Sequence, residues 1–353
     1  MSADRFDFDF ELLRELTEAS GVPGYEDRVR EIVRRELSET ADRVETDAMG
    51  NVVGTVDGES DYAVVVAAHM DEIGFMVKHV TDAGFLQVDA LGGWDPRVLK
   101  AQRVTVHTAD GDVPGVIGSA PPHTLDDEDL EAKPDLDDVY IDLGLDGEAA
   151  AGAVDVGDLV TLSQTTTVVG DHVTGKALDD RVCVFQLLEA ARRLEDPAVT
   201  VHFAATVQEE VGLRGAQAIG VDLAPDLGIA LDVTVANDLP GFDDGEQVTR
   251  LGEGAAVKLK DGSVITTPKV VRRLRAVADD AGIDYQLEVL PSGGTDTAKL
   301  QTAAGATPVG AISIPTRYLH TATESAHGDD IASAIDLLVA FLETETGEHD
   351  YRG

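Results

Sequence analysis

Four apolar segments of this sequence each end in, or lead to, residues of types that can bind a metal ion, and a fifth set of such residues opens a predicted helix. Singly, each such residue has an ordinary explanation, because a lone histidine at a strand end is usually solvated and paired aspartates often begin a helix. Together, imidazole and carboxylate side chains without thiolates are the ligands that zinc, cobalt or manganese prefer. The residues are His69 after "YAVVVAAH" with Asp71 two positions on, Asp179-Asp180 after "TGKAL", Glu209-Glu210 after "VTVHFAATVQ", Asp232 in "LGIALD", and His320 after "GAISIPTRYL".

The two adjacent glutamates raise a question of their own. "ATVQEEVGLRGA" sets Glu209 and Glu210 side by side just past an apolar run. They are either a solvated strand end or a site where a cation takes one carboxylate and a reaction uses the other. Successive residues of a strand point to opposite sides, so on either interpretation we expect the two side chains to do different things.

The elements that must position these residues alternate between helix and strand. Apolar residues at helical spacing predict two opening helices, and after Gly175 helical and strand-like segments alternate to the end of the chain. This pattern predicts an α/β fold with a mostly parallel sheet flanked by helices, in which ligand sites lie beyond the carboxyl ends of the strands. The five metal-binding segments would then meet at one edge of the sheet.

A β-rich insertion interrupts this alternation. Short strand-like pieces such as "RVTVHT", "VPGVIG" and "DLVTL" are separated by turn signals, and we find no helical stripe among them. We expect a small β-barrel or sandwich at 74–163, inserted into a discontinuous domain formed by 1–73 and 164–353. The acidic, proline-bearing segment 119–138 is expected to be a loop.

The charge balance is extreme for a folded protein. The chain has 67 acidic and 27 basic residues, a net charge of −40, and 8 lysines against 19 arginines. Acids spread along the whole sequence, with few lysines, are typical of a protein adapted to a high-salt cytosol, where salt screens the self-repulsion. The same charge disfavours nucleic acid and anionic membranes as partners.

Other features predict a cytoplasmic protein. Cys183 is the single cysteine, so no internal disulfide can form. The first residues lack the apolar core of a signal peptide, and no apolar run approaches the ~20 residues that span a bilayer.

Six motifs carry a resemblance to a known family. "AAHMDEIGF", "GKALDDR", "VQEEVGLRGA", "ALDVTVAND", "SGGTDTAKL" and "RYLHTATE" resemble, in order, the motifs of the tetrahedral aminopeptidases. These are dinuclear metallo-aminopeptidases, also known as glutamyl aminopeptidases or cellulase-like proteins. The resemblance implies a zinc-peptidase-like catalytic domain, a PDZ-like β-barrel that makes a dimer contact, and a tetrahedral homododecamer built from dimers. It implies cleavage of the N-terminal residue from short peptides.

The resemblance also implies roles for individual residues. One of two divalent metal ions, zinc or cobalt, would be held by His69, Asp179 and Asp232, and the other by Asp179, Glu210 and His320, with Asp179 bridging. The "RYLH" context favours His320 over His327 as the ligand. Asp71 would orient His69, and Glu209 would be the general base. Gly294, Thr295 and Asp296 would belong to a substrate-binding loop, although an ordinary glycine turn also explains that segment.

Three rival functions remain open at this point. A glycoside hydrolase needs paired carboxylates and usually aromatic sugar platforms, and a chain with one tryptophan and 5% aromatic residues offers few. A metal-dependent deacylase or carboxypeptidase would keep the fold and change the bond that is cut. A non-enzymatic scaffold is disfavoured because every metal and base position is present.

Overall fold

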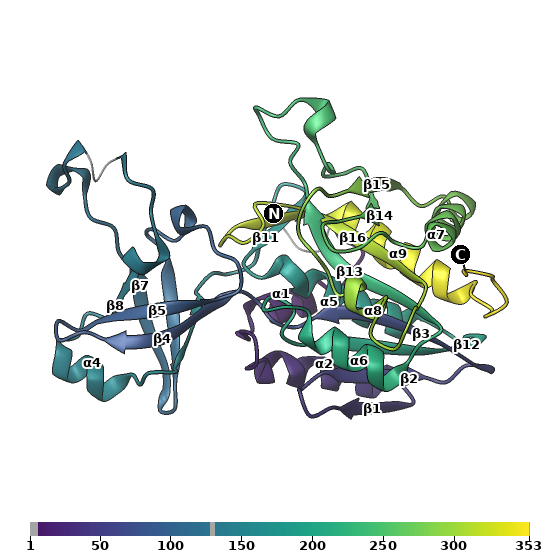
Figure 1. Cartoon of the computed structure of the whole chain (residues 1–353), viewed down its shortest axis with the longest axis horizontal. Coiled ribbons are helices and arrows are strands. Elements are labelled where there is room, and N and C mark those ends of the chain that lie inside the picture. Colours follow the sequence, from purple (N-terminus) through teal and green to yellow (C-terminus); the bar gives the residue numbers. More distant parts are fainter. Residues whose placement is uncertain (1–5, 128–130, 353) are drawn as a thin grey trace.

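The computed structural model describes residues 6–127 and 131–352. It contains a large helix-flanked sheet and a separate β-barrel, which lie side by side in Figure 1. The α/β fold with an inserted barrel is therefore confirmed. No helix in these ranges combines the length and the apolar character that crossing a membrane requires.

Within the described residues, the main sheet has eleven strands, with a parallel centre, antiparallel strands on both sides of it and a further parallel pair, β14–β15, joined to β16. The central strands run in the order β12-β3-β13-β16, and all three of their pairings are parallel. In path order the strands are β1 (Arg43–Thr46), β2 (Val52–Val56), β12 (Val199–Thr206), β3 (Ser60–His69), β13 (Leu227–Val235), β16 (Val309–Arg317), β17 (Glu324–His327), β11 (His172–Gly175) and β10 (Thr167–Val169), with β14 (Ala255–Lys260) pairing β16 and β15 (Tyr285–Val289) pairing β14.

Helices cover both faces of this sheet. The larger core lies beneath α1 (Phe10–Glu18), α2 (Asp27–Thr40), α5 (Leu178–Arg193), α7 (Pro268–Ala281) and α9 (Gly328–Glu343). The smaller core lies beneath α6 (Arg214–Leu223) and α8 (Thr297–Leu300).

The central strand β3 explains why its sequence is an unbroken apolar run. Val64, Val66 and Ala68 face the larger core, whereas Val65 and Ala67 face the smaller one. A parallel strand buried on both faces has no polar side, and this one therefore shows no alternation until it reaches His69.

The inserted barrel is closed and antiparallel, with its own core. Its strands, counted within the described ranges, run in the order β4-β5-β8-β7-β6-β9, and β4 closes on β9 through the pairs Phe75↔Val160 and Met76↔Leu159. The strands are β4 (Gly74–Val80), β5 (Phe85–Leu91), β6 (Arg103–Thr108), β7 (Gly111–Ile117), β8 (Tyr140–Asp142) and β9 (Leu159–Leu162).

The insertion also contains a helix that the sequence pattern does not predict. Helix α4 (Gly147–Ala153) has the sequence GEAAAGA and begins at Asp146, whose side chain accepts the N–H of Ala149 at 2.9 Å. Alanine and an aspartate cap favour a helix without an apolar stripe, and the stripe was the signal that we searched for. The expected loop at 119–138 holds the short 3₁₀ turns Pro122–Thr124 and Leu136–Asp138, and 128–130 lie outside the described residues.

Candidate metal centre

Strand register brings the first group of candidate ligands together. His69 is the last residue of β3 and pairs with Thr206 of β12. On the other side β13 pairs with β3 as far as Ala230↔Ala67, so two further residues along each strand bring Asp232 level with His69. We expected Asp232 to end its strand, but β13 continues to Val235 because it stays paired with β16.

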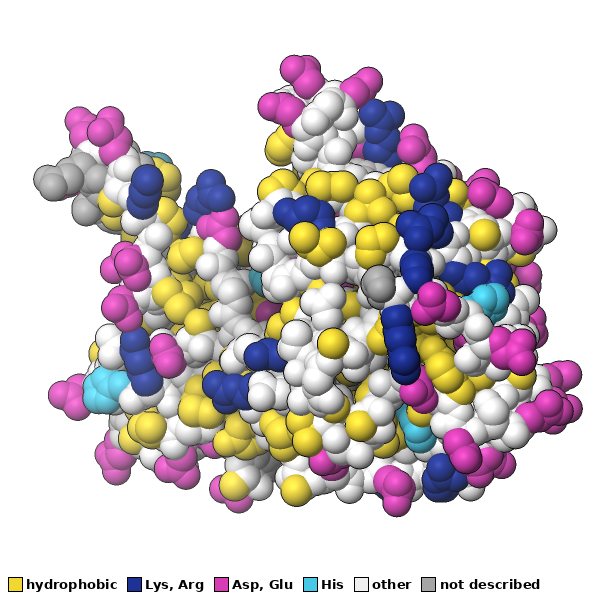
Figure 2. All heavy atoms as spheres, turned by 45° about the vertical axis from the view of Figure 1, so that its right-hand side comes forward, with side chains coloured by type: hydrophobic (Ala, Val, Ile, Leu, Met, Phe, Trp, Pro, Cys, Tyr) yellow, Lys and Arg dark blue, Asp and Glu magenta, His cyan; other side chains and the backbone are white. Residues whose placement is uncertain are grey.

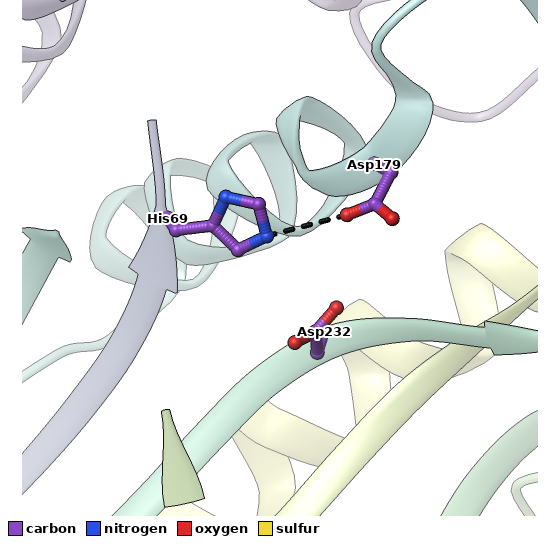
Figure 3. Close-up of side chains that lie close together, drawn as sticks. All are labelled: His69, Asp179 and Asp232. Atoms are coloured by element: carbon purple, nitrogen blue, oxygen red, sulfur yellow. Dashed lines mark ion pairs between the residues drawn. The ribbon is translucent and has the colours of Figure 1, made fainter. Parts of the chain in front are cut away.

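Asp179 approaches this pair from the first turn of α5. Helix α5 is buried along most of its length, which gives Asp179 a rigid support. His69 Nε2 lies 3.2 Å from Asp179 Oδ1, and Asp232 points towards the space between them (Figure 3). One ligand atom from each of His69, Asp179 and Asp232 lies within 4.8 Å of the other two. The neighbouring Asp180 is outside this group and accepts the backbone N–H of His69 at 3.1 Å.

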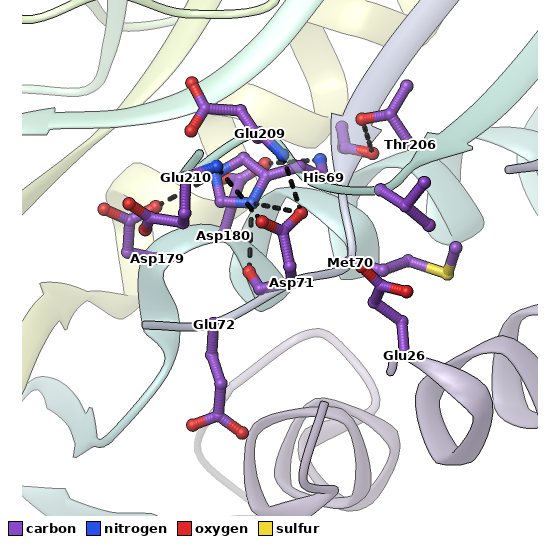
Figure 4. Close-up of polar contacts among 12 residues, drawn as sticks. Glu26, His69, Met70, Asp71, Glu72, Asp179, Asp180, Thr206, Glu209 and Glu210 are labelled. Atoms are coloured by element: carbon purple, nitrogen blue, oxygen red, sulfur yellow. Dashed lines mark hydrogen bonds and ion pairs between the residues drawn. The ribbon is translucent and has the colours of Figure 1, made fainter. Parts of the chain in front are cut away.

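The paired glutamates lie in a turn and not in the strand, so our strand-alternation premise was wrong. Strand β12 ends at Thr206, and Gln208 has a left-handed φ of 56°. Asp71 holds the turn in place, because its Oδ1 accepts the N–H of Glu209 at 3.0 Å and its Oδ2 accepts that of Glu210 at 3.1 Å (Figure 4).

Asp71 contacts His69 mainly through its backbone. His69 Nδ1 lies 3.0 Å from the Asp71 carbonyl oxygen and 3.6 Å from its carboxylate. The residue that we expected to orient His69 by its side chain thus uses that side chain to position both glutamates.

His320 completes a second group on the other side of Asp179. Its Nε2 lies 3.4 Å from Asp179 Oδ2 and 3.8 Å from Glu210 Oε1, and these three residues also offer ligand atoms within 4.8 Å of one another. The other ring nitrogen lies 2.6 Å from the carbonyl oxygen of Gly93 in the insertion. His327 is not in this group, since its Nδ1 accepts the N–H of Asp329 at the start of α9.

Burial, together with the charges of neighbouring acids, shifts the pKa values of the carboxyl groups in this cluster. Burial raises the pKa of Glu209 and Asp232 well above the usual carboxyl range, and burial with the charge of Asp179 raises that of Glu210 to about 7. For Asp179, burial acts in the same direction, but hydrogen bonds from His320 and His69 outweigh it and lower its pKa.

Although burial opposes the charged imidazoles, the neighbouring carboxylates raise the pKa of both His69 and His320. Burial opposes the charged form of His320, yet Asp179 and Glu210 raise its pKa to about 10. Among the residues described, no lysine or arginine forms an ion pair with Asp179, Glu209, Glu210 or Asp232. A donor set that draws protons onto its histidines for want of another cation fits a pair of divalent metal ions.

A cleft of about 720 Å³ opens onto both groups. Its walls come from the insertion, from the end of β13 and from the predicted substrate loop, and no lysine or arginine lines it among the described residues. Gly294 and Thr295 line the cleft, but Asp296 does not, because it is 2% exposed and lies below, with Oδ2 2.5 Å from Thr206 Oγ1.

Sequence reasoning missed Glu324. Its Oε2 accepts the N–H of Asp179 at 3.0 Å, and its Oε1 accepts the N–H of His320 at 2.7 Å. The available signal was an acid at the start of a buried strand, four residues after His320 in "HTATE".

Comparison with known proteins identifies the family. The model of the M42 glutamyl aminopeptidase family matches residues 50–337, and a second model, AMPT, matches 7–32. The chain belongs to the M42 glutamyl aminopeptidase family. It is therefore an aminopeptidase of the metallopeptidase class, a hydrolase.

Individual M42 proteins match over almost their whole length. The chain is 36% identical to the lysyl aminopeptidase of Pyrococcus furiosus, over 95% of this chain and 97% of the relative. The TET aminopeptidase structure from Thaumarchaeota archaeon SCGC AB-539-E09 superposes with a TM-score of 0.92 at 36% identity, covering 95% of this chain and 96% of that one. The structure of PhTET1-12s, a dodecamer, gives a TM-score of 0.86 at 33% identity, covering 98% and 100%.

Proposed function

We propose that this M42 aminopeptidase removes the N-terminal residue of short peptides with two divalent metal ions, zinc or cobalt. His69, Asp179 and Asp232 would hold one ion, and Asp179, Glu210 and His320 the other. The observation that carries the proposal is the pair of ligand groups that share Asp179. Bound there, the ions would polarise the scissile carbonyl and make a water molecule more acidic.

Glu209 would act as the general base. It lies outside the two groups that share Asp179, although it also offers a ligand atom within 4.8 Å of atoms of His69 and Glu210, and so it stands beside the positions proposed for the metal ions. It lines the same cleft, and its backbone is fixed by Asp71. Its carboxylate would take a proton from the attacking water and deliver it to the nitrogen of the leaving amine as the C–N bond breaks.

The charge of the cleft favours an aminopeptidase over a carboxypeptidase. A carboxypeptidase needs a cationic partner for the C-terminal carboxylate of its substrate, and no lysine or arginine lines the described cleft. The acidic groups around the metal positions instead suit the free α-amine of a peptide. Gly294 and Thr295 would contact the substrate, whereas Asp296 would support the site from below.

A panel of substrates tests this function. Metal-free protein reconstituted with zinc or cobalt alone should hydrolyse amino-acid amides and free peptides one residue at a time from the N-terminus. The same peptides with an acetylated N-terminus should stay intact, and those with an amidated C-terminus should be cut normally. Cleavage of the acetylated series, or loss of activity on the amidated one, would indicate a deacylase or a carboxypeptidase.

We further propose that the enzyme works in a salty cytosol as a tetrahedral dodecamer built from dimers, with the barrel in the dimer contact. The dodecameric relative supports the assembly, and the net charge of −40 supports the salt requirement. Acidic side chains spread over much of the face in Figure 2, on the barrel as well as on the main domain.

Dialysis tests the salt requirement. Assembly and activity should hold in molar salt and decay in ~10 mM salt, where the Debye length grows to about 30 Å and carboxylates repel over longer distances. Light scattering and amide hydrolysis after prolonged dialysis measure both. An intact, fully active oligomer in dilute buffer would refute adaptation to salt.

A further inference from the structure

One buried carboxylate joins the backbones of two predicted metal ligands. Glu324 is 2% exposed at the start of β17, and its two oxygens accept one N–H each, from Asp179 on α5 and from His320 after β16. The two acceptor oxygens therefore belong to one planar carboxylate, while the two N–H donors lie in different elements of the fold.

Both N–H groups need such an acceptor. Asp179 lies in the first turn of α5, where backbone N–H groups have no partner within the helix. His320 has a left-handed φ of 59° and lies between β16 and β17, so its N–H takes no part in the hydrogen bonding of a strand or helix. Both hydrogen bonds are partly buried, and both end on the carboxylate of Glu324, so this one side chain holds the two backbones at once.

The side chains of these two residues converge as a result. Asp179 Oδ2 and His320 Nε2 lie 3.4 Å apart, and Gly93 fixes the far side of the imidazole through its carbonyl oxygen. Only the group formed by Asp179, Glu210 and His320 contains both residues whose backbones Glu324 binds. The group formed by His69, Asp179 and Asp232 contains one of them.

We propose that Glu324 is a positioning residue that sets the geometry of the second metal site. The inference rests on the proposed dinuclear function. Partners behind the ligands of a metal site typically affect its affinity by about 10–100-fold. Loss of the Glu324 carboxylate should therefore weaken the second site by that factor and the first site much less.

Asp330 offers a matched control elsewhere in the chain. It is fully buried in the first turn of α9, and its two oxygens accept the N–H groups of Gly252 and Gly254 at 2.8 and 2.7 Å. As at Glu324, one buried carboxylate accepts two backbone N–H groups. Here, however, neither glycine is a predicted ligand or lines the cleft. Asp330→Asn thus reports what losing a doubly bonded buried carboxylate does to stability alone.

The experiment compares metal binding in the two variants. In Glu324→Gln the new amide nitrogen must face one of the two N–H donors, which breaks one hydrogen bond and keeps the size. Calorimetric titration of metal-free protein with zinc should show one site weakened by about 10–100-fold, and anomalous scattering from zinc-soaked crystals should locate the loss beside His320. Asp330→Asn should melt at a lower temperature and bind both ions as the wild type does.

Each other outcome is informative. Excess metal should return the kcat of Glu324→Gln towards that of the wild type, because no reacting group is removed. Equal weakening of both sites, unchanged affinities, or the same loss in Asp330→Asn would overturn the positioning role.

If Glu324→Gln does not fold, Glu324→Asp keeps the charge with a shorter reach and should show the same site-selective loss. A wild type that binds fewer than two ions would refute the dinuclear function itself, whatever the variants do.

Discussion

Two regions of this molecule differ in the partners of their buried carboxylates. Lys258 of β14 is fully buried and forms ion pairs with Glu288 and Asp261. Glu288 is its direct partner on the neighbouring strand β15. At the carboxyl edge of the central strands, Asp179, Glu209, Glu210 and Asp232 lie together without a lysine or arginine ion-pair partner among the described residues. The ion pairs of Asp179 and Glu210 there are with His69 and His320.

The difference shows where the chain supplies its own counter-charge and where it does not. Only 8 lysines are present, yet Lys258 and Lys176 are both buried in ion pairs, the latter with Glu72 at 2.7 Å. Lys258 and Lys176 neutralise structural carboxylates, whereas the four acids at the carboxyl edge of the central strands have no lysine or arginine ion-pair partner among the described residues, which supports the proposal that they bind an external cation.

The largest expected effect separates the two glutamates of the metal centre. Glu209→Gln should bind both metal ions and keep the fold, yet lose turnover by about 10²–10⁴-fold, the range for removing a general base. Glu210→Gln should lose affinity for one ion, and excess metal should restore part of its activity. Rates and bound metal across a metal titration distinguish the variants, and rescue of Glu209→Gln in place of Glu210→Gln would reverse the two roles.

The second prediction concerns the self-compensated region. Lys258→Met leaves Glu288 and Asp261 buried without their cation, and removing one partner of a buried pair costs about 3–5 kcal/mol of unfolding free energy. Denaturant unfolding measures the loss. Metal titration should show neither site weakened, because Lys258 is a cation that acts on the proposed ligand Asp232 and its removal cannot reduce the negative charge there. Adding Glu288→Leu should recover part of the stability. If Lys258→Met also weakened metal binding, the two regions would not be independent.

The smallest effect concerns Glu26, a buried carboxyl whose negative charge is only weakly neutralised by its neighbours. Burial raises the pKa of Glu26 from 4.5 to about 7, against a hydrogen bond from Gly24 N–H and a 3.5 Å contact with Arg30. Because the folded state favours the protonated form, its stabilisation is complete below pH 4.5 and is lost as the pH rises through 7.

Glu26→Gln imitates the protonated carboxyl and keeps an acceptor for Gly24. Relative to the wild type it should gain on the order of 3 kcal/mol of unfolding free energy between pH 4.5 and 7.5, because the pKa of Glu26 is raised from 4.5 to about 7 and each pKa unit corresponds to about 1.4 kcal/mol. Denaturant unfolding of both proteins across this range measures the gain. A difference that does not change with pH would show that Glu26 stays ionised in the folded protein.

Sequence patterns were most successful in predicting residues whose side chains can bind a metal ion and whose positions follow from a regular strand or helix. His69 and Asp232 follow from apolar strands and parallel register, and the insertion follows from its turn signals. The alanine-rich helix α4 has no apolar periodicity and was missed. The orientation of Glu209 and Glu210 depends on a turn held by Asp71, a contact between residues 138 and 139 positions apart that no local pattern encodes. Glu324 was missed for the same reason, since its partner Asp179 lies 145 positions away.

The closure of the barrel between β4 and β9 has a consequence for how the chain folds. Joining His69 to Asp179 across an open chain of about 110 residues would carry a large loop-closure entropy, and each doubling of loop length adds about 0.6 kcal/mol. Because the first and last barrel strands pair through Phe75↔Val160, an insertion that folds first brings its two ends together. The effective loop then shrinks to the short connections on either side. We infer that early folding of the barrel speeds assembly of the parallel sheet, whose long-range pairings are otherwise slow to form.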